Sequence, residues 1–445
     1  MSKRLFNLHT HGQYDYASQV IELNNELFNR STDDILRIIN IEDVKKLYGR
    51  ELDLYQTYIH EMTHFIDSTT TLWGLEFICR MYRWFNDKSP KYLEVLALND
   101  AEITMHQDLS DEDFELTLDF KEIKFSLEYS DTVGVFVHFH YLNELGEPLQ
   151  SIPLSMLSIF EGHAYAQEKL IACKIYECNE DVISLSILKR EINEQISQLK
   201  SSEYTGLLSL TMQLLPNVKL SRKLELICIV SKFCFNTPAL FLAMTPEDLL
   251  SKIFSGAPQD YVSSLKMEFS RGANRSSLAL VILLSIIMQA NSDDAFLNNL
   301  TTEQIESLIL NIYARNDQSS SDLKEMLKAH WLIEFELLIK ICDELGAELP
   351  SKMASQAIDL DWYASTINEF SLPQVMLTNG DWVSFKKSLD FNVQKHFDDM
   401  LANSIELEAE LVDYGIRREH KAPSFYHGWL KHMKYEGTGL YIHDD

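Results

Sequence analysis

The sequence is poor in basic residues. In its 445 residues, 39 Lys and Arg stand against 67 Asp and Glu, which gives a formal net charge of −28. So acidic a chain repels phosphate backbones, and it contains no basic stripe interleaved with aromatic residues. We therefore expect no nucleic-acid partner. The excess of acid indicates a solubilising surface or a basic protein partner.

Closely spaced cysteines and long apolar runs are also missing. The six cysteines include no CxxC pair, so we expect reduced thiols rather than a disulfide scaffold. The N-terminus "MSKRLFNLHTHGQYDY" lacks the apolar segment of a secretory signal. The most hydrophobic run, "LALVILLSIIMQA" from Leu278, is too short to span a bilayer and indicates a buried helix. We expect a cytoplasmic protein without a membrane partner.

No Gly-rich phosphate loop and no GxSxG elbow is present, which argues against phosphate-loop enzymes and serine hydrolases of the α/β class. What is present is strong hydrophobic periodicity, which changes along the chain. Spacings of three and four, as in "VIELNNELF", predict helices from about residue 18 to 100. Alternation of period two predicts an antiparallel sheet within about 114–153, beginning with a strand over 114–120. From Ser155 the pattern is helical nearly to the end.

These patterns predict an α+β fold that is mainly α, with a small antiparallel sheet and a large helical C-terminal region. At this length two or three domains are expected. We expect a metal-binding catalytic region over 1–178, including the sheet, and a mainly helical domain over 179–445.

The stretch "YIHEMTHFID" carries the HExxH pattern at His60, Glu61 and His64. On a helix from about Leu52, an apolar face runs through Tyr55, Ile59 and Met62, and both histidines lie on another side, one turn apart. Two imidazoles at this spacing can bind one zinc ion at about 2.0–2.1 Å each. Glu61 lies beside His60, where it would contact a water at the metal as a general base.

A catalytic zinc site usually takes a third protein ligand and leaves one position open. The segment "FEGHAYAQEKLIA" from Phe160 offers Glu161 and Glu168 on one helical stripe. The small residues Gly162 and Ala164 would let this helix approach the HExxH helix closely. Glu161 is the predicted ligand, and Glu168 would replace it if the register of the helix differed.

HEMTH followed by EGHAYAQE resembles the motif pair of the gluzincins, the clan of thermolysin-like proteases and zinc aminopeptidases. The resemblance covers only these two segments. It implies a zincin-like HExxH helix, a helix bearing the Glu ligand, and a Zn²⁺ site of His60, His64 and Glu161 with Glu61 as base. It also implies a protein or peptide substrate.

Four further residues are candidates for supporting roles. Asp67 and Glu168 could each accept a hydrogen bond from a ligand imidazole, although an ordinary salt bridge is an equal alternative for both. His163 and Tyr165 could stabilise an oxyanion.

Two other histidine patterns offer alternatives. His9 and His11, followed by Asp15, could open the metal site of a barrel hydrolase, but the alternating strands and helices of a barrel do not follow. His138 and His140 lie on one face of a predicted strand, where two exposed histidines are commoner than a metal site. The same strand, Val133–Tyr141, is a candidate edge for holding a substrate as an added strand.

The function predicted from these residues is a zinc metallopeptidase in which Glu61 takes a proton from water and passes it to the leaving amine. The alternative is an acidic helical interaction or regulatory protein with a structural or inactive metal site. A structural site is normally closed by four protein ligands, so a fourth ligand such as Asp67 or Glu168 would favour that alternative.

Overall fold

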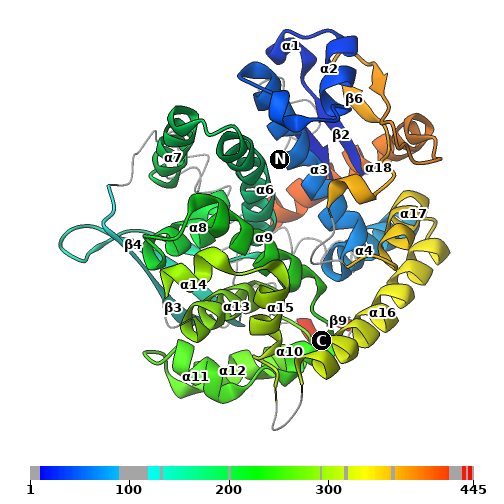
Figure 1. Cartoon of the computed structure of the whole chain (residues 1–445). Helices are drawn as coiled ribbons and strands as arrows, with labels where there is room; N and C mark the ends of the chain where they lie inside the picture. Colours follow the sequence, from blue (N-terminus) through cyan, green and yellow to red (C-terminus); the bar gives the residue numbers. More distant parts are fainter. Residues whose placement is uncertain are drawn as a thin grey trace. The chain divides into compact units, whose positions relative to one another are not determined.

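The computed structural model describes residues 11–89, 119–130, 134–198, 202–290, 293–314, 319–361, 366–419, 433–436 and 439–442. Helices dominate these residues and three small sheets accompany them, which confirms the α+β, mainly α fold class (Figure 1). The chain divides into two compact units. Unit 1 comprises Met1–Leu93, Ala164–Leu188 and Leu337–Arg417; unit 2 comprises Glu94–His163, Lys189–Glu336 and Arg418–Asp445. The predicted boundary at residue 178 stays a prediction.

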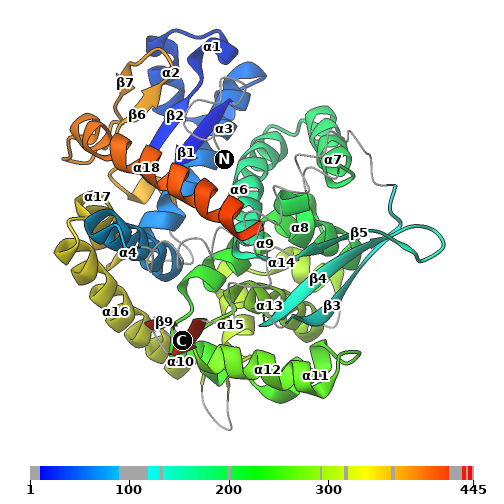
Figure 2. The same cartoon turned by 180° about the vertical axis from the view of Figure 1, so that it is seen from behind.

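Unit 1 contains a four-stranded sheet that the periodicity did not reveal. Its strands are β1 (Gly12–Asp15), β2 (Val20–Leu23), β6 (Val375–Leu377) and β7 (Trp382–Val383), in the order β1-β2-β6-β7. β1 and β2 pair antiparallel, whereas β2 and β6 pair parallel, so segments far apart in the sequence contribute to one sheet (Figure 2). The prediction of a helix beginning in "VIEL" was therefore wrong, because these residues form a short strand with partners far along the chain.

Unit 1 also contains several helices. They are α1 (Asn25–Phe28), α2 (Thr32–Ile39), α3 (Arg50–Thr70), α4 (Leu72–Asp87), α17 (Glu348–Ala357) and α18 (Val393–Glu419), with short 3-10 turns at Val44–Lys46 and Ile367–Glu369. The HExxH helix α3 packs on β1 and β2 on the sheet side and on α4 and α17 elsewhere. It is therefore buried on nearly all sides.

A tight corner between α3 and α4 fixes the end of the HExxH helix. The Thr71 hydroxyl donates to the Asp67 carbonyl at 2.5 Å and accepts from the Gly74 N–H at 3.0 Å, which caps α4. A Cβ at Gly74 would collide with the backbone of Asp67 and Ser68. Only glycine lets the second helix start this close to the first.

Unit 2 contains the antiparallel sheet that the alternation predicted. It consists of β3 (Glu122–Ser130), β4 (Gly134–Leu142) and β5 (Pro148–Pro153), in the order β3-β4-β5. The predicted strand over 114–120 lies almost entirely outside the described residues. Because β4 pairs on both sides, the prediction that Val133–Tyr141 offers a free edge to a substrate was wrong.

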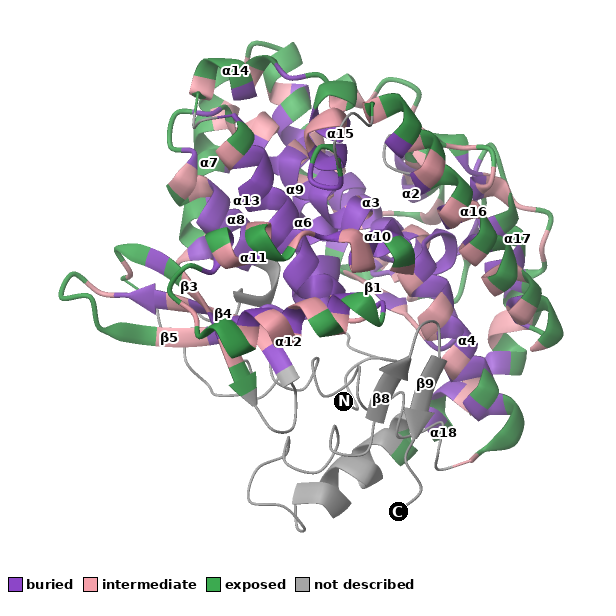
Figure 3. Ribbon diagram, turned by 90° about the horizontal axis from the view of Figure 1, so that it is seen from below, coloured by how far each residue is buried: buried purple, intermediate pink, exposed green. Residues whose placement is uncertain are grey.

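The helical body of unit 2 is built around α13. Its helices are α8 (Ser202–Leu214), α9 (Leu220–Asn236), α10 (Ala239–Met244), α11 (Glu247–Ile253), α12 (Gln259–Ser270), α13 (Arg275–Gln289), α14 (Asp294–Asn299) and α15 (Thr302–Leu310). α13 is buried from Arg275 to Ile287 and packs against α9 and α15 (Figure 3). The apolar run from Leu278 is thus a buried helix, as predicted.

Helices α6 (Met156–Cys178), α7 (Val182–Ile196) and α16 (Ser320–Glu344) run from one unit into the other, as do the last two residues of α18. The region after Ser155 also contains β6 and β7 and a hairpin of β8 (Met433–Glu436) and β9 (Gly439–Ile442), so it is less uniformly helical than predicted.

Among the described residues, no single helix combines the length and the hydrophobicity needed to cross a membrane. Helices α12 and α13 reach that composition only when taken together, and they are bent by 109° relative to each other.

Candidate metal centre

Helix α3 presents both histidines of the HExxH pattern on one side. Tyr55, Ile59 and Met62 are buried on the apolar face that the sequence predicted. The side chain of His64 is also buried, and the side chain of His60 is 15% exposed to solvent. Burial of two imidazoles requires polar partners, because an unsatisfied ring nitrogen is costly away from water. The partners of His60 define the site.

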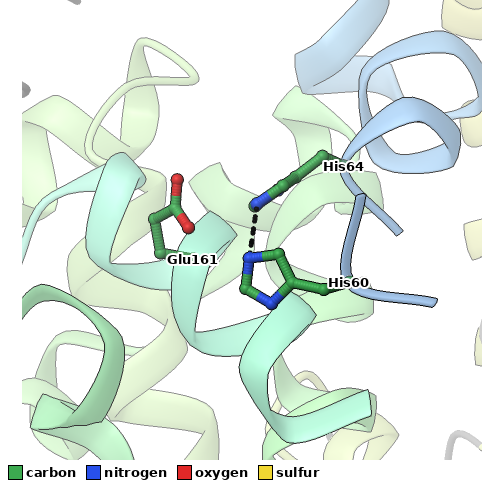
Figure 4. Close-up of side chains that lie close together, drawn as sticks. All are labelled: His60, His64 and Glu161. Carbon is green, nitrogen blue, oxygen red and sulfur yellow. Dashed lines mark hydrogen bonds between the residues drawn. The ribbon is translucent and has the colours of Figure 1, made fainter. Parts of the chain in front are cut away.

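The two imidazoles meet through their Nε2 atoms. These atoms are 3.2 Å apart, and the rings stand nearly perpendicular at 86° (Figure 4). Two ligands of a tetrahedral zinc ion, each about 2.05 Å from the metal, are separated by roughly 3.3 Å. The observed separation therefore fits one shared metal ion without movement of the α3 backbone.

Glu161 on helix α6 completes a group of three. A carboxylate oxygen of Glu161 and one ring nitrogen each of His60 and His64 all lie within 4.8 Å of one another (Figure 4). Two imidazoles and one carboxylate are a donor set that suits zinc. The structure thus brings together the three residues that the sequence predicted as ligands, from two helices separated by the β3–β5 sheet in the chain.

Glu168 occupies the other nitrogen of His60. Its Oε2 atom is 3.1 Å from His60 Nδ1, and its Oε1 atom accepts from Lys169 Nζ at 2.6 Å. Burial works to raise the pKa of Glu168, but Lys169 and His60 outweigh burial and lower the pKa to about 2. The carboxylate is therefore ionised and can only accept, so His60 carries its proton on Nδ1. Its Nε2 lone pair then faces His64, and Glu168 contacts the other ring nitrogen and is not a member of the three-residue group.

Glu61 is buried on α3 and lies against strand β1. A Cβ added to Gly12 would come 2.8 Å from Thr57 Cγ2 and 3.0 Å from Glu61 Cγ. Those distances are too short for an undisturbed contact, so the absence of a side chain at Gly12 gives Glu61 its space. The sequence reasoning missed this role of β1, because a four-residue strand is too short for a periodicity signal.

The remaining candidates occupy different surroundings. Asp67 is buried on α3 but is not a member of the three-residue group. His163 lies on α6 two residues after Glu161, which turns it to the other side of the helix, and its ring lies 6.0 Å from that of Phe235. Tyr165, one turn after Glu161, is closer to the ligand stripe, and Lys169 Nζ lies 5.4 Å from its ring.

The turn after β1 adds an aromatic neighbour that the sequence reasoning also missed. The ring of Tyr16 lies 6.4 Å from that of His64 and 6.3 Å from that of Phe77 on α4. It helps to hold His64 in place between the sheet and the two helices.

The N-terminal histidine pattern is used for packing. His9 lies outside the described residues. His11 packs on Phe28 with ring centroids 5.0 Å apart, and Asp15 accepts hydrogen bonds from the Ala17 and Ser18 N–H groups. Of the metal-compatible groups found in the described part of the chain, neither includes His11 or Asp15.

Comparison with known proteins identifies no relative: no family model, no curated protein and no solved structure matches this chain.

Proposed function

We propose that this protein is a zinc-dependent metallopeptidase whose metal is held by His60, His64 and Glu161. The observation that carries the proposal is the 3.2 Å approach of the two Nε2 atoms within reach of the Glu161 carboxylate. Three protein ligands leave one of four tetrahedral positions for water or substrate, which is the arrangement of a catalytic rather than a structural zinc site. Zinc bound there would polarise a carbonyl and lower the pKa of a water molecule.

Glu61 is the residue proposed to move the proton. It follows His60 directly on α3, so its side chain leaves the helix beside the ligands and not between them. As general base it would take a proton from the attacking water and then deliver it to the departing amine. Its burial beside Gly12 restricts its rotamers and keeps it close to the reaction.

Glu168 is proposed as a positioning residue. By accepting the Nδ1 proton of His60, it orients the ring and makes Nε2 a better electron donor. Lys169 holds the other oxygen of the same carboxylate, so Glu168 is fixed at both ends.

Strand β1 is the proposed place for the substrate backbone. β1 is an edge strand in the order β1-β2-β6-β7, and no strand among the described residues pairs with its outer side. Its first residue, Gly12, lies against Glu61. A peptide added along this edge would gain main-chain hydrogen bonds next to the general base. We propose a reducing, cytoplasmic location as well, because the cysteines of this chain are free thiols.

The test is a Glu61→Gln variant of the full chain, assayed for peptidase activity on a peptide library and for zinc content. Glu51→Gln is the matched control, because Glu51 is the other glutamate of α3 and forms a surface ion pair with Arg37. We expect Glu61→Gln to keep one zinc per chain and to lose about 100-fold or more in kcat, since general-base catalysis contributes that much. Wild-type protein that binds zinc but cleaves nothing, or full activity in the variant, overturns the proposal.

A further inference from the structure

A second group of metal-compatible side chains lies wholly within unit 2, on the β3–β4–β5 sheet. It consists of Glu128 on β3 and of His138 and His140 on β4. Residues two apart on a strand point to the same face, so the two histidines project side by side. Ser126 pairs directly with His138 and Glu128 lies diagonal to His138, while His140 pairs with Lys124.

The two distances from Glu128 to the histidines are close to those between ligands of one metal ion, and all three ligand atoms lie within 4.8 Å of one another. Glu128 Oε2 is 3.0 Å from His138 Nδ1, and Glu128 Oε1 is 3.4 Å from His140 Nε2. Ligands of a tetrahedral zinc ion are separated by roughly 3.3 Å. The single carboxylate therefore already bridges the two ring nitrogens that would share the ion.

The hydroxyl groups of two serines lie within hydrogen-bond distance of the His140 ring. Ser151 on β5 lies with its hydroxyl 2.8 Å from His140 Nδ1, where it can accept a proton from Nδ1 once a metal ion holds Nε2. The Ser126 hydroxyl donates to Glu128 Oε1 at 2.8 Å, so its oxygen is left to accept from His140 Nε2 at 2.7 Å, and a bound ion would take the place of that Nε2 proton.

The group is also open to solvent. The side chains of His138, His140 and Glu128 are 20%, 23% and 39% exposed, so an ion can enter from solvent.

We propose that Glu128, His138 and His140 bind a divalent transition-metal ion, in the first instance Zn²⁺, independently of the His60–His64–Glu161 centre. Two imidazoles exclude Mg²⁺ and Ca²⁺, which prefer oxygen ligands throughout. Three protein ligands on an accessible face leave room for water, so this ion exchanges with solvent. It differs in that respect from a structural zinc, which four ligands enclose.

The experiment measures metal binding and does not depend on peptidase activity. The background protein carries His60→Ala and His64→Ala, which remove two ligands of the first centre. In this background, Zn²⁺ binding is measured by equilibrium dialysis and Co²⁺ binding by visible d–d absorption. Glu128→Gln, His138→Gln and His140→Gln are compared with Glu122→Gln, which removes a carboxylate from the same strand but from outside the group. Mg²⁺ in excess serves as the competitor.

We expect the background and Glu122→Gln proteins to bind one Zn²⁺ and one Co²⁺ despite the Mg²⁺. Each variant of the group should bind both metals about tenfold more weakly or worse. Equal affinity in all four variants would mean binding to the acidic surface at large and would overturn the proposal. Since the double background variant could fail to fold, zinc stoichiometry is also measured in the otherwise wild-type chain. There it should fall from two to one in His138→Gln, and an unchanged stoichiometry contradicts the second site.

Discussion

His60 Nδ1 lies 3.1 Å from Glu168 Oε2, while Nε2 of the same ring faces His64. One imidazole is therefore held by a carboxylate on one side and offered to the metal position on the other. The two carboxylates near the His60 ring belong to Glu161 and Glu168, which are seven residues apart on α6 and lie on one stripe of that helix.

Removing the support of His60 should weaken metal binding. Glu168→Gln abolishes the ionised acceptor of the Nδ1 proton, and we expect zinc affinity to fall about 10- to 100-fold. Glu177→Gln, an exposed carboxylate on the same helix, is the control. Competition with a zinc-binding dye measures both affinities. Equal affinities in the two variants would show that Glu168 does not position the ligand.

Crowding Glu61 should impair catalysis without removing the metal. In Gly12→Ala the new Cβ would come 3.0 Å from Glu61 Cγ, so the general base must shift. We expect kcat to fall about 10- to 100-fold with one zinc retained, because small misplacements of a catalytic group are costly. Gly256→Ala is the control, since a Cβ there meets nothing within 4 Å and the backbone is not in the left-handed region. Wild-type kcat in Gly12→Ala would contradict the placement of Glu61.

The two motif helices could be predicted from the sequence because their signals are local. The three- and four-residue steps through Tyr55, Ile59 and Met62 predicted the buried face of α3, and the HExxH spacing placed both imidazoles on one side. The stripe from Glu161 to Glu168 on α6 indicated the second helix. What the stripe did not decide was which carboxylate faces which nitrogen, because that depends on the packing of two helices.

The sheet around β1 could not be predicted, because its signals are short and distant. β1 and β2 have four residues each, and β6 and β7 have three and two. The parallel pairing of Glu22 with Met376 joins residues from opposite ends of the chain, which no local window detects. The prediction of a free edge at Val133–Tyr141 was likewise wrong, because β5 pairs with β4 on the side opposite β3.

One carboxyl group in unit 2 should make stability depend on pH. Burial raises the pKa of Glu268 from 4.5 to about 7, although its oxygens accept from Val135 N–H and from the Asn274 amide. Because the folded pKa exceeds the unfolded one, the stability that this group contributes is complete below pH 4.5 and is lost as pH rises through 7. The loss is about 3 kcal/mol.

Denaturant unfolding of wild type and Glu268→Gln between pH 4.5 and pH 8 measures this contribution, since the neutral amide does not titrate. The stability of wild type relative to the variant should fall across that interval. Glu247→Gln, on an exposed glutamate of α11, should keep the wild-type dependence. A pH profile of Glu268→Gln parallel to that of wild type would contradict the assignment.

Thiol reactivity should single out one cysteine. Cys178 is exposed, whereas Cys79, Cys173, Cys228, Cys234 and Cys342 are buried. Burial also raises the pKa of the Cys234 thiol to about 12. A disulfide reagent should therefore modify one thiol of the native protein rapidly and the other five only after denaturation. Cys178→Ser should remove the rapid phase, and its persistence in that variant would refute the burial pattern.

We propose that His60, His64 and Glu161 hold one zinc ion with a position left open, and crystallography tests this most directly. Anomalous diffraction recorded above and below the zinc absorption edge locates the metal. We expect a peak at about 2.0–2.1 Å from both Nε2 atoms and about 2.0–2.2 Å from a Glu161 oxygen, with no fourth protein ligand. No peak at these residues, or an ion enclosed by four side chains, would contradict it.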